Sequence, residues 1–193
     1  MKIGLDLDEV VADFMDALLK FYYYKKGRLH KKEEFLEYKW WPVWGISKEE
    51  AIALVDEFHK AHNLEDIKLA EGAIESISDL LNRSYELFII TARPVRFRNK
   101  IEEWIKHHLK TNKIKLIHAG DFHKGQAATK AEICNKEGIK LLLEDSGETA
   151  LDCAEKGVSV ILFDKPWNKL YNHKKIKRVK NWHEAMNAIL TMP

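Results

Sequence analysis

Five short apolar runs occur along the chain, and each is rich in Ile, Leu, Val or Phe. Within each run the apolar side chains occupy both odd and even positions, which is typical of parallel strands covered by helices on both faces. The runs span residues 2–7, 86–91, 114–118, 139–143 and 158–163. The pattern therefore predicts five buried strands of one parallel sheet.

Between these runs, apolar residues recur at helical spacing. One such face comprises Phe97, Ile101, Trp104, Ile105 and His108, a second comprises Ile74, Ile77, Leu80 and Leu81, and a third, opened by a capping box at residues 47–50, comprises Ile52, Val55 and Phe58. The alternation of strands and helices predicts an α/β fold with a doubly wound, five-stranded parallel sheet.

The connection between the first two runs is too long for a simple crossover. It has 77 residues between Asp8 and Glu86, whereas a helical crossover needs about 12–30. The surplus is unusually aromatic, with Tyr22, Tyr23, Tyr24, Phe35, Tyr38, Trp40, Trp41 and Trp44. We therefore expect a small helical cap at residues 16–70, inserted into a core domain of residues 1–15 and 71–193.

Composition fits this organisation, because 193 residues at roughly 150 per domain correspond to one domain with an insertion. Hydrophobic residues make up 46% and charged residues 32%, which excludes a disordered chain. No apolar stretch reaches the ~18 residues of a membrane span, and acids occupy the place of a signal-peptide core. The two isolated cysteines, Cys134 and Cys153, are expected to be reduced. We expect a cytoplasmic protein without membrane contact.

The net charge of +2 conceals a basic tail. Residues 165–193 contain seven Lys and Arg residues against Glu184 alone, a net charge of +6, which leaves −4 for residues 1–164. Such a tail could contact nucleic acid or another anion. A solvated surface is the more common role of a short basic run, so a nucleic-acid partner is not expected.

Two aspartates follow the first apolar run at a spacing of two, Asp6 and Asp8. They stand at the carboxyl end of a strand, where open α/β sheets bind ligands. If the strand continues, both side chains lie on one side of it. If the chain turns after Leu7, Asp8 lies over the strand end instead. The alternative without function is an acidic loop.

Polar residues also follow two other strands. Thr91 and Arg93 end the second run, where a hydroxyl and helix-start amides could bind phosphate or, alternatively, cap a helix. Glu144 and Asp145 end the fourth run, and Lys130 begins the helix before it. These groups all belong to the same edge of one sheet, so we expect them to form a site.

This ordered set resembles the haloacid dehalogenase-like (HAD) phosphohydrolases over nearly the whole chain. In detail the chain is similar to the cytosolic type-C 5′(3′)-deoxyribonucleotidase family, through DLDEVVADF at 6–14, ITARP at 90–94, LLLEDS at 141–146 and DKPWN at 164–168. The resemblance implies a Rossmann-like core with strand order 5-4-1-2-3, Asp6 on the central strand, and a helical cap after the first motif.

The resemblance also implies phosphoryl transfer from a monoester with Mg²⁺ as cofactor. Asp6 would be the nucleophile that forms an aspartyl-phosphate, and Asp8 the general acid and base. The Mg²⁺ ligands would be the Asp6 carboxylate, the Asp8 backbone carbonyl and Asp145, with Glu144 behind them. Glu144 replaces the second aspartate that is common in the family, which keeps a carboxylate but lengthens it.

Phosphoryl oxygens would be held by Thr91 and Lys130, with Lys124 as the alternative lysine, because spacing alone does not separate the two. Arg93 either assists them or forms a cap or surface ion pair. The nucleobase would stack on Phe14, Trp40 and Trp41, a contact that contributes about 1–3 kcal/mol per base; these rings could equally form the core of the cap.

The favoured hypothesis is therefore a Mg²⁺-dependent 5′-nucleotidase for (deoxy)nucleoside monophosphates. One alternative is a phosphatase for a sugar phosphate or a polynucleotide end, the latter using the basic residues Lys174, Lys175, Lys177 and Arg178. A receiver-like phosphate switch is the other, with Asp121 after the third strand, where no partner carboxylates are expected. Base and sugar preference and homodimer formation stay open.

Overall fold

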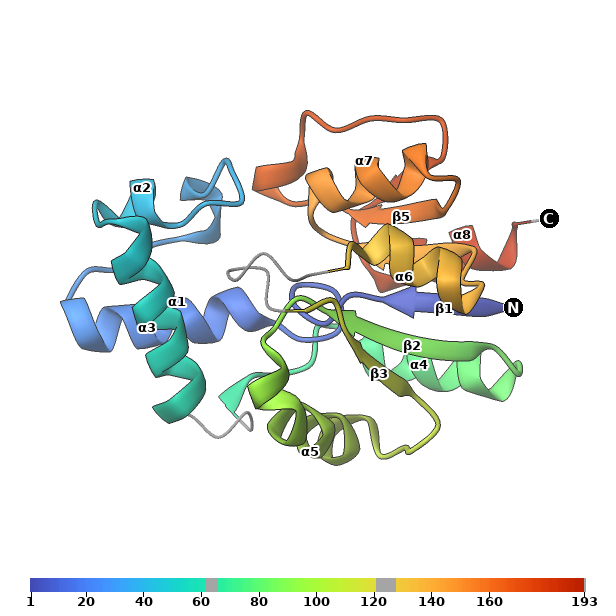
Figure 1. Ribbon diagram of the computed structural model, residues 1–193, viewed down its shortest axis with the longest axis horizontal. Helices are drawn as coiled ribbons and strands as arrows, with labels where there is room; N and C mark the ends of the chain where they lie inside the picture. The colour runs from blue at the N-terminus through green and yellow to red at the C-terminus, as the bar shows by residue number, and fades with distance from the viewer. Residues whose placement is uncertain (62–65, 121–127, 193) are drawn as a thin grey trace.

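A parallel sheet with helices on both faces forms the larger part of the molecule (Figure 1). The computed structural model describes residues 1–61, 66–120 and 128–192. The strands are β1 (Lys2–Leu5), β2 (Glu86–Thr91), β3 (Lys115–His118), β4 (Leu141–Glu144), β5 (Ser159–Phe163) and β6 (Ile176–Val179), in the order β3-β2-β1-β4-β5-β6. The α-helices of this part are α4 (Ala73–Asn82), α5 (Arg98–Leu109), α6 (Lys130–Glu137), α7 (Gly147–Glu155) and α8 (Trp182–Leu190).

The odd and even apolar positions of the central strands face different helices. Leu141 and Leu143 belong to the larger apolar core, with residues of α4, α5 and α8, whereas Leu142 belongs to a second core with residues of α6 and α7. This division explains why the strands are apolar at every position, and it confirms the doubly wound sheet. Gly4 allows close packing around β1, because a Cβ there would lie 2.9 Å from a Leu142 methyl group and 3.1 Å from one of Ile90, so these side chains would have to shift.

The five expected strands are confirmed, and so is their order, but the strand count is wrong. The sheet has a sixth strand, β6, which pairs with β5 within the basic tail. Its four residues include Lys177 and Arg178 at its centre, so it does not form an apolar run. Short, charged edge strands are common because they discourage pairing with other chains. A search for unbroken apolar runs does not find such strands.

The long connection after β1 contains α1 (Phe14–Lys26), the 3₁₀ turn η1 (Lys32–Glu34), α2 (Trp41–Trp44) and α3 (Lys48–Ala61). These three α-helices form a group beyond the carboxyl ends of the strands, opposite the two chain termini (Figure 1). The expected capping box is present at the start of α3, where Ser47 and Glu50 exchange hydrogen bonds. Within the described residues no helix is long and apolar enough to cross a membrane.

The aromatic residues of this insertion divide into two sets. Tyr22 and Trp44 are buried and stack on each other with ring centroids 4.5 Å apart, and Phe35 packs edge-on against Trp44. These rings form the apolar interior of the insertion, which is continuous with the larger core of the sheet domain. Trp40 and Trp41 are only half-buried, Tyr38 is 45% exposed, and Tyr24 is 83% exposed. The half-buried and exposed rings are therefore available to a ligand.

Candidate active site

A buried lysine and three buried carboxylates meet at the carboxyl ends of the two central strands. Lys130, the first residue of α6, places its Nζ 2.5 Å from Asp6 Oδ1 and 2.8 Å from Glu144 Oε2. Asp6 follows β1, Glu144 ends β4, and Asp145 comes next in the chain. The structure thus brings Lys130 into the predicted cluster, whereas Lys124 lies outside the described residues.

The carboxylates of Asp6, Glu144 and Asp145 form a group in which one oxygen of each lies within 4.8 Å of the others. Both Glu144 oxygens are engaged, because Oε1 accepts from the backbone N–H groups of Asp145 and Ser146 while Oε2 accepts from Lys130. Asp145 Oδ1 is buried and has no hydrogen-bond partner among the described residues. A buried acceptor of this kind, beside a second carboxylate, fits a hard cation such as Mg²⁺.

The electrostatics of the cluster also favour an added cation. Burial raises the pKa of Asp6 to about 7, the charge of Glu144 adds to the effect, and Lys130 opposes it. Burial, followed by the charges of Glu144 and Asp6, raises the pKa of Asp145 well above its usual range. Burial alone would lower the pKa of Lys130, but the charges of Asp6 and Glu144 raise it on balance. One ammonium group therefore faces three carboxylates, and a divalent cation would offset the remaining negative charge.

Asp8 lies apart from this cluster. The chain turns directly after β1, where the N–H groups of Val11 and Ala12 both donate to the Leu7 carbonyl, at 3.1 and 2.8 Å. Of the two arrangements left open by the sequence, the structure therefore has the turn. The Asp8 carboxylate accepts two hydrogen bonds from Arg93, from Nη2 at 2.5 Å and from Nε at 3.0 Å. Arg93 is only 6% exposed and Asp8 is half-buried, so this is a partly buried two-point ion pair.

Thr91 is the last residue of β2 and is fully buried. Its Oγ1 accepts a hydrogen bond from the Arg93 N–H at 3.1 Å, so the hydroxyl stabilises the turn that carries Arg93. The helical turn that follows, η3 (Val95–Phe97), has Pro94 at its N-cap without a side-chain cap. Thr91 therefore does not cap a helix, and its place at the strand end beside β1 is consistent with phosphate binding.

Aromatic rings form a row from the insertion to the sheet domain. Phe14 stacks on His59, with centroids 5.5 Å apart, and Trp40 lies 6.1 Å from Phe14. Tyr38 lies 6.3 Å from Trp40 and 6.2 Å from Trp167, which follows β5. Trp41 packs under Lys48, whose Nζ is 5.8 Å from the ring centroid.

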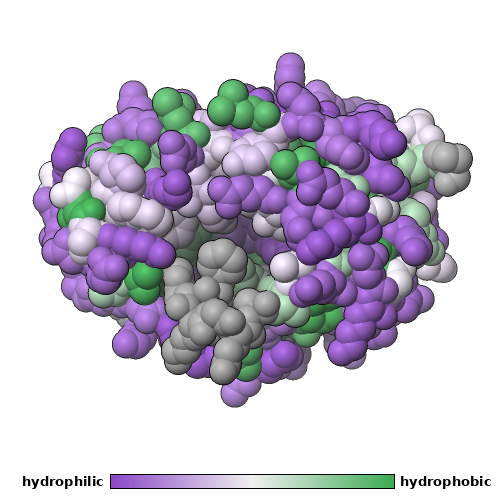
Figure 2. Space-filling view, turned by 45° about the horizontal axis from the view of Figure 1, so that its top comes forward, coloured by the Kyte–Doolittle hydropathy of each residue, from purple (hydrophilic) through white to green (hydrophobic). Residues whose placement is uncertain are grey.

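The face of the molecule in Figure 2 is mostly hydrophilic and is hollowed near its middle.

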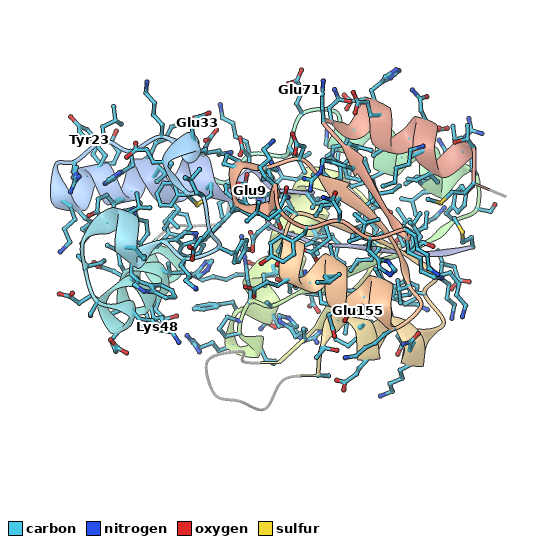
Figure 3. The ribbon with its side chains drawn as sticks, turned by 90° about the horizontal axis from the view of Figure 1, so that it is seen from above. Glu9, Tyr23, Glu33, Lys48, Glu71 and Glu155 are labelled. Carbon is cyan, nitrogen blue, oxygen red and sulfur yellow. The ribbon has the colours of Figure 1, made fainter. Side chains whose placement is uncertain are left out.

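Sequence reasoning missed a second charged cluster, around Glu9. Glu9 is buried and has a φ of 61°, in the left-handed region that non-glycine residues rarely adopt. Its carboxylate accepts from the Met15 N–H at 2.7 Å, from Lys32 Nζ at 3.1 Å and from Lys165 Nζ at 3.2 Å. Glu9 therefore joins the insertion to the turn after β5, and Figure 3 shows it at that junction.

Lys32 also pairs with Asp13, the residue before α1, and with Asp16 in the first turn of that helix. Asp13 is the N-cap residue of α1, but its side chain makes no cap hydrogen bond. The signals for this cluster were present in the sequence, as a charged residue after the two aspartates and a lysine in DKPWN. Nothing in the sequence pattern, however, indicated that they would meet.

A parallel Rossmann-like sheet with this carboxylate and lysine cluster at its switch point defines a HAD-like hydrolase. Solved structures agree on the fold. The crystal structure of a predicted phosphatase from Clostridium acetobutylicum has a TM-score of 0.69 and 17% identity, covering 99% of this chain and 98% of that one. CbbY from Rhodobacter sphaeroides in complex with phosphate has a TM-score of 0.62 and 16% identity, covering 95% of each chain.

The family model described as "5' nucleotidase, deoxy (Pyrimidine), cytosolic type C protein" matches residues 1–192, and the chain belongs to this family. Among curated relatives, "Putative nucleotidase YqfW" of Bacillus subtilis is 27% identical over 96% of this chain and 92% of its own length. "Putative nucleotidase BH1399" of Halalkalibacterium halodurans is 26% identical over 95% and 90%. The protein is thus a phosphatase/nucleotidase-type hydrolase. The receiver-like alternative relied on Asp121, outside the described residues, and these similarities do not support it.

Proposed function

We propose that the protein is a Mg²⁺-dependent 5′-nucleotidase that hydrolyses (deoxy)nucleoside monophosphates through an aspartyl-phosphate on Asp6. The observation that carries the proposal is the buried cluster of Asp6, Lys130, Glu144 and Asp145, in which Asp145 Oδ1 has no partner among the described residues. Family membership and relatives named as nucleotidases support the substrate class.

In the proposed reaction an Asp6 carboxylate oxygen attacks phosphorus, and the bond from phosphorus to the leaving alkoxide breaks. Lys130 and Thr91 donate hydrogen bonds to phosphoryl oxygens and stabilise the charge that develops on them. When bound, Mg²⁺ supplies the charge that offsets repulsion between the Asp6 carboxylate and the anionic phosphate. Asp6 and Asp145, with the Asp8 carbonyl, would hold it.

Asp8 donates a proton to the departing alkoxide and then accepts one from the water that hydrolyses the aspartyl-phosphate, which releases phosphate and restores Asp6. The Asp8 side chain is bound to Arg93 in this structure. We propose that this pair is the resting arrangement, from which substrate binding redirects the Asp8 carboxyl towards the leaving oxygen. Arg93 then interacts either with the phosphate or with the turn after Thr91 to which Arg93 itself belongs.

Substrate selection belongs to the insertion in this proposal. Residues 16–70 act as the cap, and the base stacks against Trp40 and Trp41, whereas Phe14 is only 4% exposed and packs against Trp40 from inside the protein. Arg93 contacts Phe14 as well, because its guanidinium carbon lies 5.0 Å from the ring centroid. Arg93 thus contacts both Asp8 and the buried ring that packs against Trp40. A cytoplasmic location agrees with the "cytosolic" description of the family, and homodimer formation stays a prediction.

The basic tail gives little support to a polynucleotide-end substrate. Arg178 donates to Asp164, to Asn168 and to the Tyr171 carbonyl, so it is engaged inside the protein. Neutralising Lys174, Lys175 and Lys177 together should leave phosphate release from nucleoside monophosphates unchanged. A selective loss of activity on nucleic-acid ends would favour the alternative substrate.

The test is phosphate release, with and without EDTA, from a panel of ribo- and deoxynucleoside monophosphates, sugar phosphates and p-nitrophenyl phosphate. Asp6→Asn should abolish release, whereas Asp79→Asn on the surface of α4 should match the unaltered protein. Release that persists in Asp6→Asn would overturn the mechanism. Release from p-nitrophenyl phosphate but from no nucleotide would keep the mechanism and reject the substrate.

A further inference from the structure

The 3₁₀ turn η5 (Pro166–Asn168) holds Asp145 at two points. Trp167 Nε1 donates to Asp145 Oδ2 at 3.0 Å, which fixes the side chain. Asn168 Nδ2 donates to the Asp145 carbonyl at 2.7 Å and to the Phe163 carbonyl at 2.7 Å, which fixes the backbone. All of these residues are buried. Asp145 is therefore oriented by the turn that follows the neighbouring strand β5, through residues more than twenty positions later in the chain.

This arrangement decides which Asp145 oxygen is available. A carboxylate can rotate so that its two oxygens exchange places, and the rotation has only broad preferences of its own. With the indole N–H on Oδ2, the other oxygen, Oδ1, is left without a partner among the described residues. A partner that binds one oxygen of a carboxylate ligand and leaves the other for the ion is a common support in metal sites.

The turn is itself held in place from β6. Arg178 Nη1 donates to Asn168 Oδ1 at 2.5 Å, and Nη2 donates to the carbonyls of Asn168 and Tyr171 at 2.9 and 3.0 Å. Tyr171 packs so closely on the start of α7 that a Cβ at Gly147 would lie 2.0 Å from its ring. The edge strand β6, which the apolar pattern did not predict, thus supports the turn that orients Asp145.

Trp167 also faces the insertion. Its ring meets that of Tyr38 edge-to-face, at 6.2 Å and 72°. Partial removal from water and then the charge of Asp145 raise the pKa of the Tyr38 phenol well above its usual value, in keeping with a hydroxyl that stays protonated near the carboxylates. The indole therefore has two separable contacts, its N–H with Asp145 and its ring with Tyr38.

We propose that Trp167 is a positioning residue for the cation site, which selects Asp145 Oδ1 as the ligand atom by holding Oδ2. The inference rests on the proposed function, because it assumes that Asp145 binds the divalent cation. It assigns a role to the Trp-Asn pair of DKPWN, which the chemistry of phosphate transfer does not by itself require. The turn acts through Asp145 and does not touch the substrate's phosphorus.

The test compares Mg²⁺ affinity by isothermal titration calorimetry in the absence of substrate. Trp167→Phe keeps an aromatic ring against Tyr38 but removes the N–H donor together with part of the indole, so Mg²⁺ binding should weaken by about 10- to 100-fold, the usual effect of losing such a support. Trp104→Phe is the matched control, since Trp104 Nε1 donates to the Ile67 carbonyl at 2.9 Å in another buried place. It should bind Mg²⁺ as the unaltered protein does.

Asp145→Asn separates failure of this inference from failure of the proposed function. If the unaltered protein binds no Mg²⁺, or if Asp145→Asn binds it equally well, the cation site of the proposed function is wrong. The positioning role is then wrong as well. If that binding is present and Trp167→Phe binds Mg²⁺ with unchanged affinity, only the positioning role is overturned.

A second measurement needs no Trp167 variant. The chain has six tryptophans, so its ¹H–¹⁵N spectrum should contain six indole resonances. Adding Mg²⁺ should shift one of them strongly, because the indole that binds Asp145 Oδ2 responds to an ion on Oδ1, and Asp145→Asn should remove that shift. Six unshifted indole resonances at saturating Mg²⁺ would overturn the inference.

Discussion

The two sides of the candidate site are built differently. On the sheet side, Asp6, Lys130 and Asp145 are at most 8% exposed and stand at the ends of regular elements. On the insertion side, Trp40 is half-buried and Tyr38 is 45% exposed, and they belong to a loop and the edge of a four-residue helix. Rigid elements can hold reacting groups to within fractions of an ångström, whereas loops can adapt. In the proposed function, this difference corresponds to chemistry on the sheet and choice of substrate on the insertion.

The two charged clusters also differ, in how far their charges are balanced. At the sheet end, the single ammonium of Lys130 faces three carboxylates, which leaves negative charge for a cation. At the junction, Glu9 is bound by two lysines, Lys32 and Lys165. The first cluster keeps an excess of carboxylates, which suits the proposed cation, whereas Glu9 is already compensated and joins two parts of the fold.

The largest expected effect is that of Lys130→Met. The variant leaves Asp6 and Glu144 buried without their cation, which should lower the free energy of unfolding by about 3–5 kcal/mol at pH 8 and abolish turnover. The loss of stability should shrink at acid pH, where the carboxylates take up protons. Urea denaturation measures it, with Lys136→Met on the exposed side of α6 as control. A loss no greater than that of the control would mean that the cluster does not depend on Lys130.

Asp8→Asn should lower kcat by about 10²–10⁴, because the leaving alkoxide then lacks its proton donor. The asparagine keeps the shape of the side chain beside Arg93. Nitrophenolate is a better leaving group than a nucleoside alkoxide, so the first turnover of p-nitrophenyl phosphate in rapid-mixing experiments should be affected much less. Equal losses for the two leaving groups would contradict the acid role of Asp8.

Replacing the rings on the insertion side should affect binding and leave the chemistry intact. Trp40→Leu and Trp41→Leu should each raise KM for a nucleotide by about 5- to 150-fold, which corresponds to a stacking contribution of about 1–3 kcal/mol. KM for a small sugar phosphate should stay unchanged. Tyr24→Leu, at an 83% exposed position, is the control. Equal changes for both substrates would show that these rings only build the insertion's core.

The smallest effect concerns His59, which stacks on Phe14 between the two sides. Burial, then the charge of Arg93, lowers the pKa of His59 to about 2. The unfolded chain, with a histidine pKa of about 6.5, therefore binds more protons between these values, and stability falls as the pH drops below about 6.5. From pH 7.5 to 5.5 this amounts to about 1.4 kcal/mol, which His59→Gln should remove from the measured difference. An unchanged pH dependence would contradict a neutral, buried His59.

Much of the architecture could be predicted from the apolar pattern. The buried strands β1, β2, β4 and β5 show as unbroken apolar runs, because helices cover both faces. The strand β6 could not be found in this way, because an edge strand needs few apolar residues and carries Lys177 and Arg178 instead. The cap at residues 16–70 and the roles of the site residues stay predictions, although the structure brings several of those residues together.

Local chemistry left open which contacts Lys130 and Asp8 make at the site. Lys130 and Lys124 are similar in spacing, and the structure places Lys130 against Asp6 while Lys124 is outside the described residues. Asp8 could lie beside Asp6 or beyond the strand end, and the turn after Leu7 directs it to Arg93. In each case the partners are more than eighty positions apart, so no local pattern records their contact.

By itself the sequence determined the doubly wound sheet, the place of the insertion, and the strand ends where Asp6, Thr91 and Glu144 stand. These follow from side-chain periodicity and from the rule that parallel strands present their carboxyl ends at one edge. The tertiary structure alone decided that Trp167 meets Asp145 and that Glu9 meets Lys165. Hydrogen bonds act over about 3 Å in space and are indifferent to separation along the chain, so only the folded protein shows which donors reach which carboxylates.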